Sequence, residues 1–218
     1  MARPRIEGLS DLIFGLALSI GAIQLVGSAP GDQTALLTSV GAFGFSFLIL
    51  ISIWNRYTAI ATTVPVESAA MVRLNMLLLF LVALEPYLFN LLMAREGPAA
   101  ALGQGVSALY ALDIGGMNLV LAYFTHVLAS EEEALVPREA IGRFKNARNA
   151  LLVVSLLFVV SALPFFWTVS YQGTQLKFVL WILSIPAIWL SRRLSGERRG
   201  DPARPAPPAP VDADEATL

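Results

Sequence analysis

The sequence predicts an all-α integral membrane protein with six transmembrane helices. Hydrophobic residues make up 56% of the 218 positions and charged residues only 14%, which is about half the charge usual in soluble domains. The mean hydropathy is +0.66, and the apolar residues gather in six long runs. Each run approaches the roughly 20 residues that an α-helix needs to cross a bilayer, and is too long for a barrel strand. This pattern excludes a water-soluble enzyme.

The six predicted helices share a transmembrane domain formed by residues 1–195. They cover residues 9–27, 35–61, 71–94, 101–128, 149–169 and 176–193. The connection at 128–148 contains Glu131, Glu132, Glu133 and Pro137, which is typical of a solvated loop with a short amphipathic lead-in to the fifth helix. Residues 196–218 are rich in Ala and Pro and have an acidic end, so a disordered cytoplasmic tail is predicted.

The basic residues predict that both termini are cytoplasmic. With six membrane crossings, thirteen Lys and Arg residues fall on one side, and only Arg95 and Lys177 fall on the other. Positive charge near the ends of helices stays in the cytoplasm. A cleaved signal peptide ending near Gly27-Ser28-Ala29 remains an alternative for the first helix, although Glu7 and Asp11 are unusual in such a peptide.

Composition excludes several kinds of chemistry. The net charge of −1 offers no basic surface for nucleic acid, and the absence of cysteine excludes disulfides and Cys-ligated metals. The single histidine, His126, has no metal-binding cluster around it, and no acidic pair has catalytic spacing. We therefore expect no enzymatic activity, no metal site and no cofactor.

The first helix begins with a polar cluster that includes Ser10 and Asp11. Counting about 1.5 Å per residue from the inner ends of the helices puts Trp54 and Asn75 at the same depth. The Trp54 indole and the Asn75 amide are hydrogen-bond donors that would satisfy the Asp11 carboxylate and link three helices. The alternative is that each residue separately anchors its helix at the membrane interface.

An apolar stripe follows on the same helix. Leu16, Ile20 and Ile23 recur at i, i+4 and i+7, with Ser19 beside them. Periodicity alone favours ordinary packing between helices of one molecule.

The N-terminal part of the chain resembles a known family. Arg5-x-x-x-Leu9-Ser10-Asp11 is similar to the Arg-x-x-x-Phe-Ser-Asp motif of prokaryotic relatives of the endolysosomal potassium channel transmembrane protein 175. Further resemblances follow in order over residues 5–90, and they are Ser46-Phe47, Trp54, Leu74-Asn75, Leu79-Phe80 and Pro86. The chain departs from the family at Leu9, at residues 21–24, at Tyr57 in place of a histidine, and at Glu85.

The resemblance implies a homotetrameric potassium channel in the cell membrane, with four first helices lining a central pore. It aligns Leu16 with a hydrophobic constriction, Ser19 with a pore-facing threonine, and Ile20 and Ile23 with later apolar pore positions. No Thr-Val-Gly-Tyr-Gly filter segment occurs in the sequence, so carbonyl rings are not the expected filter. Potassium ions, further copies of the chain and the lipid bilayer are the expected partners.

Two other functions remain open. Asp113, close to Tyr110, Gly115-Gly116 and Asn118 in the fourth helix, is a candidate substrate or proton site for a secondary or proton-coupled transporter. The second open function is that of a structural or assembly protein that transports nothing. In a channel, we expect Asp113 to form a hydrogen bond to a neighbouring helix, whose close approach Gly115 and Gly116 would allow. We expect Glu85 to lie at the pore mouth or the membrane interface.

Overall fold

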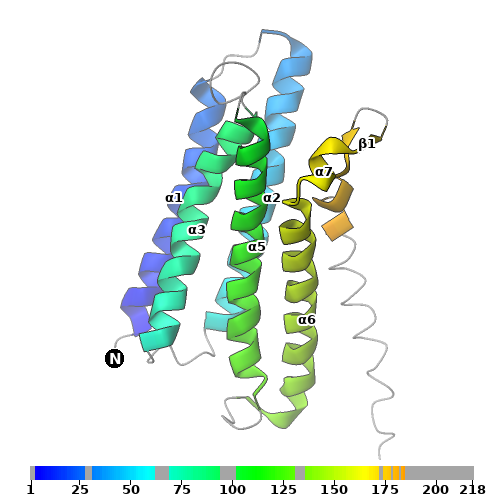
Figure 1. Cartoon of the computed structure of the whole chain (residues 1–218). Helices are drawn as coiled ribbons and strands as arrows, with labels where there is room; N and C mark the ends of the chain where they lie inside the picture. Colours follow the sequence, from blue (N-terminus) through cyan, green and yellow to red (C-terminus); the bar gives the residue numbers. More distant parts are fainter. Residues whose placement is uncertain are drawn as a thin grey trace, which may run out of the picture.

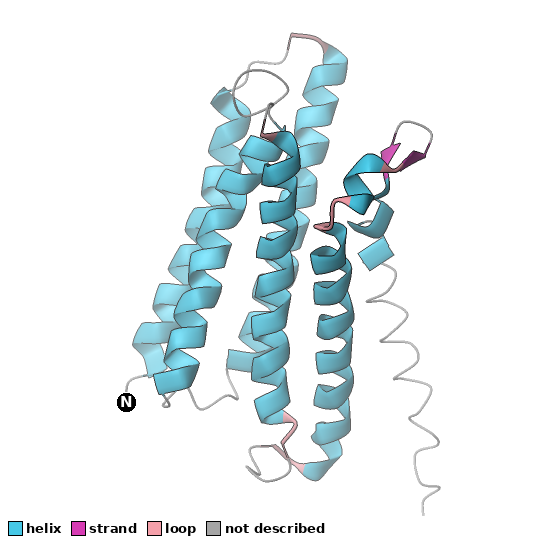
Figure 2. Ribbon diagram, in the orientation of Figure 1, coloured by secondary structure: helices cyan, strands magenta, loops and turns pink. Residues whose placement is uncertain are grey.

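The computed structural model describes residues 3–27, 31–61, 69–93, 102–130, 136–171, 174–177, 179–181 and 183–184. The long helices are α1 (Arg3–Gly27), α2 (Gln33–Ala61), α3 (Ala69–Met93), α5 (Gly103–Leu128) and α6 (Arg138–Ser161). A four-residue helix follows, α7 (Phe165–Thr168), and then β1 (Ser170–Tyr171) pairs antiparallel with β2 (Thr174–Gln175). Figure 2 shows that helices dominate the described residues, so the predicted all-α class is confirmed apart from this small hairpin.

Among the described residues, four helices are long and apolar enough to cross a membrane, namely α2, α3, α5 and residues Ala140–Ser161 of α6. The apolar part of α1, Gly8–Ile23, is shorter. The predicted sixth helix at 176–193 is helical where it is described, up to residue 184, and its remainder lies outside the described residues. The predicted tail at 196–218 also lies outside them.

The fifth predicted helix had the wrong bounds. We expected 149–169, but α6 begins at Arg138 and ends at Ser161. The amphipathic lead-in is therefore the first part of the helix itself. Pro164 explains the early end, because proline lacks a backbone N–H and its ring disfavours helical geometry in the residue before it.

Successive long helices run in opposite directions (Figure 1). α5 packs between α3 and α6, while α1 packs against α3 and α2. The start of α1, the start of α3, the end of α5 and the start of α6 lie at one end of the bundle (Figure 1). We call this the inner end, because Arg73 and Arg138 lie there and the predicted orientation places such basic residues on the cytoplasmic side.

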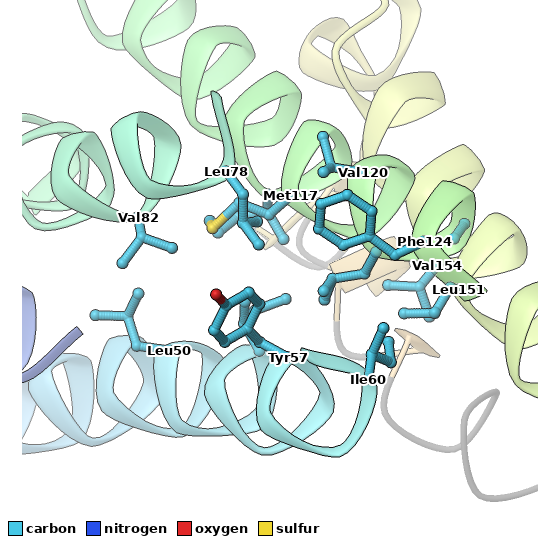
Figure 3. Close-up of a cluster of buried hydrophobic side chains, with 14 of the residues drawn as sticks. Leu50, Tyr57, Ile60, Leu78, Val82, Met117, Val120, Phe124, Leu151 and Val154 are labelled. Carbon is cyan, nitrogen blue, oxygen red and sulfur yellow. The ribbon is translucent and has the colours of Figure 1, made fainter. Parts of the chain in front are cut away.

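The core lies where α2, α3, α5 and α6 meet. Figure 3 shows side chains of α2 directed toward those of α3 and α5, among them Leu50, Tyr57, Leu78, Val82 and Met117. Gly115 allows the closest approach, because a Cβ there would lie 2.9 Å from Val159 Cγ2. The Ser155 hydroxyl donates to the Gly115 carbonyl oxygen at 2.8 Å. Gly115 thus allows the close helix contact that the sequence predicted.

Candidate pore helix and buried polar groups

The apolar stripe of α1 faces away from the rest of the protomer. Phe14 and Ala17, on the other face of the helix, are each 1% exposed and belong to the core. In contrast, Leu16 is 58% exposed, Ile20 39% and Ile23 67%. Packing inside one protomer therefore does not explain this stripe. In a membrane, such a face meets lipid, another subunit or a pore.

Ser19 is exposed on the same side of α1. Its hydroxyl donates to the carbonyl oxygen of Gly15 at 2.8 Å, one turn earlier in the helix. This bond uses the hydroxyl proton and leaves lone pairs on the oxygen. Ser19 is thus able to present an oxygen, rather than a proton, to a cation beside the helix.

Near its inner end, α1 is joined to α2 by two hydrogen bonds. The Trp54 indole Nε1 donates to Asp11 Oδ1 at 3.1 Å, where Asp11 is exposed. One residue earlier, the hydroxyls of Ser10 and Tyr57 lie 2.8 Å apart in a buried position. The two bonds hold the start of the apolar stripe against one face of α2.

The structure does not bring all the predicted residues into this network. Asn75 is buried on α3, but its amide nitrogen has no hydrogen-bond partner among the described residues. Arg5 lies in the first turns of α1, and its side chain is outside the described residues. The predicted link between α1 and α3 through Asp11 and Asn75 is therefore not formed.

Sequence reasoning missed the role of Tyr57. Tyr57 stands in place of a histidine of the family pattern, and no partner was predicted for it. The Tyr57 ring also packs against Phe14, with ring centroids 5.7 Å apart. The available signal was the spacing, since Trp54 and Tyr57 are one helical turn apart and face the same neighbour.

Glu85 lies in a second polar cluster, in the outer half of the bundle, and the prediction that places it at a pore mouth or interface is wrong. The side chain is fully buried on α3. Its carboxylate accepts hydrogen bonds from Ser46 Oγ at 2.9 and 3.1 Å and from Tyr110 OH at 3.1 Å. Hydroxyl donors from α2 and α5 offset the loss of water around a buried carboxyl group, which is why it is tolerated there.

Asp113 lies one turn beyond Tyr110 on α5 and is also buried. Neither of its oxygens has a hydrogen-bond partner in the part of the chain that the structure describes, so the predicted bond to a neighbouring helix is absent. Asn118 makes such a bond instead, because its Oδ1 accepts from Arg56 Nη1 at 2.9 Å. No pattern in the sequence distinguishes these two residues.

Within the described residues, no group of three or more His, Asp or Glu side chains could hold a metal ion. Side-chain hydrogen bonds join α1 to α2 at one depth, and α3 to α2 and α5 at another. Together with the membrane-length helices, this arrangement defines a multi-pass membrane protein whose first helix exposes an apolar face.

A comparison with protein families identifies the relationship. The model of the family described as the endosomal/lysosomal potassium channel TMEM175 matches residues 5–86. No curated protein and no solved structure matches the chain. The match spans nearly all of α1, all of α2 and most of α3. It confirms the predicted resemblance, so the chain is related to a potassium channel family through its first three helices.

Proposed function

We propose that the chain is a potassium-preferring cation channel in which copies of α1, four in a tetramer, surround a central pore. The observation that carries this proposal is the outward-facing stripe of Leu16, Ile20 and Ile23. It lies inside the segment that matches the potassium channel family. A channel needs no catalytic group, and relation to a channel family implies that the chain is not an enzyme. The cell membrane is the proposed location.

The constriction in this proposal is a ring of four Leu16 side chains. Such a ring excludes water from a narrow apolar passage, and a pore of this kind is gated by dewetting. Ser19 lies about one turn farther out, where its oxygen would contact a partly dehydrated cation. Ile20 and Ile23 continue the lining toward the outer end.

The role proposed for Asp11 and Ser10 is to position the pore helix. The bonds from α2 to these two residues fix the rotation of α1 just below Leu16. Asp11 is itself exposed, so a role for its carboxylate in the ion path is the competing assignment.

Electrical recording tests the class of transport. The purified protein in a planar bilayer, with opposed potassium and sodium gradients, should give unitary ohmic current steps whose reversal potential shifts toward that of potassium. Flux that is coupled to protons and lacks unitary steps would contradict the channel.

Thiol accessibility tests the pore assignment. The chain has no cysteine, so a thiol reagent can react only with the cysteine introduced at Leu16, Ser19 or Ile23. A charged thiol reagent in water should block current through Leu16→Cys and Ile23→Cys. Leu109→Cys is the matched control, since Leu109 is a similarly exposed leucine on α5. Unmodified Leu16→Cys and Ile23→Cys would refute the assignment.

The second candidate function is a secondary or proton-coupled transporter that uses Asp113. The observation that favours it is a buried carboxyl group without a described hydrogen-bond partner, in the same region as Glu85. Ionisable residues inside a membrane are costly and often carry a proton or ion. Asp113→Asn would abolish transport in a carrier, and would leave the reversal potential unchanged in the channel.

A further inference from the structure

A groove of about 610 Å³ opens on the outside of the protomer between α3, α5 and α6. Leu74 and Leu77 of α3 form one wall, Leu152 of α6 forms the other, and Leu119 and Tyr123 of α5 lie between them. Apart from its polar end, the lining is apolar. The groove does not belong to the pore helix, and the match to the potassium channel family does not cover α5 or α6.

One end of this groove is cationic. His126, in the last turn of α5, and Arg148, on α6, both line it. Arg148 Nη1 lies 3.2 Å from His126 Nδ1, and Arg148 also donates to Asn149 Oδ1, from Nε at 3.3 Å and Nη2 at 3.1 Å. In the described part of the chain, the hydrogen-bond partners of Arg148 are therefore His126 and an amide, and none is a carboxylate.

The depth of these two residues agrees with that of a lipid headgroup. His126 lies in the last turn of α5, at the inner end of the bundle (Figure 1), and Arg148, in the middle of α6, directs its guanidinium group to His126. From His126 to Leu119, the helix rises about 10 Å toward the membrane centre. The groove thus offers a positive charge at the inner interface, and its apolar lining extends from there toward the centre of the bilayer.

We propose that this groove binds one anionic phospholipid of the inner leaflet. The phosphate would contact Arg148 and His126, and an acyl chain would lie along Leu119, Tyr123 and Leu152. Arginine is suited to this contact because its planar guanidinium group bonds two phosphate oxygens at once. Basic pockets between transmembrane helices on the cytoplasmic side are known to hold anionic headgroups.

Lipid binding to the intact protein tests this proposal without any measurement of current. Delipidated protein in detergent is titrated with dioleoyl phosphatidylglycerol or dioleoyl phosphatidylcholine, and bound lipid is counted by native mass spectrometry. Phosphatidylglycerol should bind several-fold more tightly. Arg148→Gln should weaken the binding of phosphatidylglycerol about fivefold, to an affinity nearer that of phosphatidylcholine. One basic side chain near a membrane contributes about that factor to the binding of an anionic lipid. Arg148→Lys should retain most of the preference.

Two further variants separate the groove from general surface charge. Arg143→Gln removes an exposed arginine of α6 that lies over Phe144, outside the groove, and should leave lipid binding unchanged. Leu119→Trp fills the apolar part of the groove and should weaken the binding of both lipids. Equal binding of the two lipids, or an equal effect of Arg143→Gln and Arg148→Gln, would overturn the proposal. So would loss of the oligomer in Leu119→Trp, which would mark the groove as a contact between subunits.

Discussion

Helices α1 and α5 are both apolar and both contain an aspartate, yet they differ in how much of their surface is buried inside the protomer. On α1 the large side chains Leu16 and Ile23 are exposed, and Asp11 is exposed while it accepts a bond from Trp54. On α5 most of the membrane-length segment is buried inside the protomer, Asp113 included. Among the described residues, α1 leaves one apolar face uncovered, whereas α5 packs against helices on more than one side. The proposed pore is assigned to α1.

The largest expected effect concerns Leu16. Leu16→Asn places an amide in the proposed constriction, which lets water enter and lowers the barrier to ions. Lowering a barrier by about 1.4 kcal/mol raises a rate tenfold, so conductance or open probability should rise by about that factor in single-channel recordings. Leu109→Asn makes the same change at a similarly exposed leucine of α5 and should leave the current unchanged. Equal effects of the two variants would remove the distinction between the helices.

The second expected effect concerns stability and arises from the buried aspartate of α5. A buried polar group without a partner costs about 1–3 kcal/mol. Asp113→Leu, which has a similar volume and no polar atoms, should therefore raise the free energy of unfolding in detergent by about that amount. Unfolding is followed by helical circular dichroism at increasing denaturant. A loss of stability would show that Asp113 has a bonding partner, and would remove the unpartnered carboxyl group that favours the transporter.

The helices and their inner polar ends could be predicted from the sequence. Hydropathy follows from the order of residues alone, and the depth of a residue in the membrane follows from its distance along the helix. Depth counting was sufficient to pair Asp11 with Trp54. It failed for Asn75 because residues at one depth meet only if the helices are also rotated to face each other, and each residue turns the helix by about 100°. The same limit explains why the burial of Glu85 between Ser46 and Tyr110 was not foreseen. The end of α6 before Pro164 was, in contrast, available from local sequence.

A smaller effect is expected at the buried hydroxyl pair between α1 and α2. Ser10→Ala and Tyr57→Phe each remove the 2.8 Å bond, and a buried hydrogen bond contributes about 0.5–1.5 kcal/mol net. Each variant should lower the free energy of unfolding by about that amount. The double variant should lose less than the sum, because both changes remove one interaction. Additive losses would show that the two hydroxyls act independently.

The smallest stability effect is expected at Asp11, where it decides between two roles for the carboxylate. The bond from Trp54 is exposed, so water replaces part of what Asp11→Ala removes, and the loss should fall at the low end of about 0.5–1.5 kcal/mol. Asparagine keeps an oxygen that accepts from the indole, whereas alanine does not. If Asp11 positions α1, Asp11→Asn should assemble and select potassium as the parent does, and Asp11→Ala should give less tetramer on size-exclusion chromatography. If instead Asp11→Asn assembles normally but shifts the reversal potential, the charge acts on the ion, and Asp11 belongs to the pore together with Leu16.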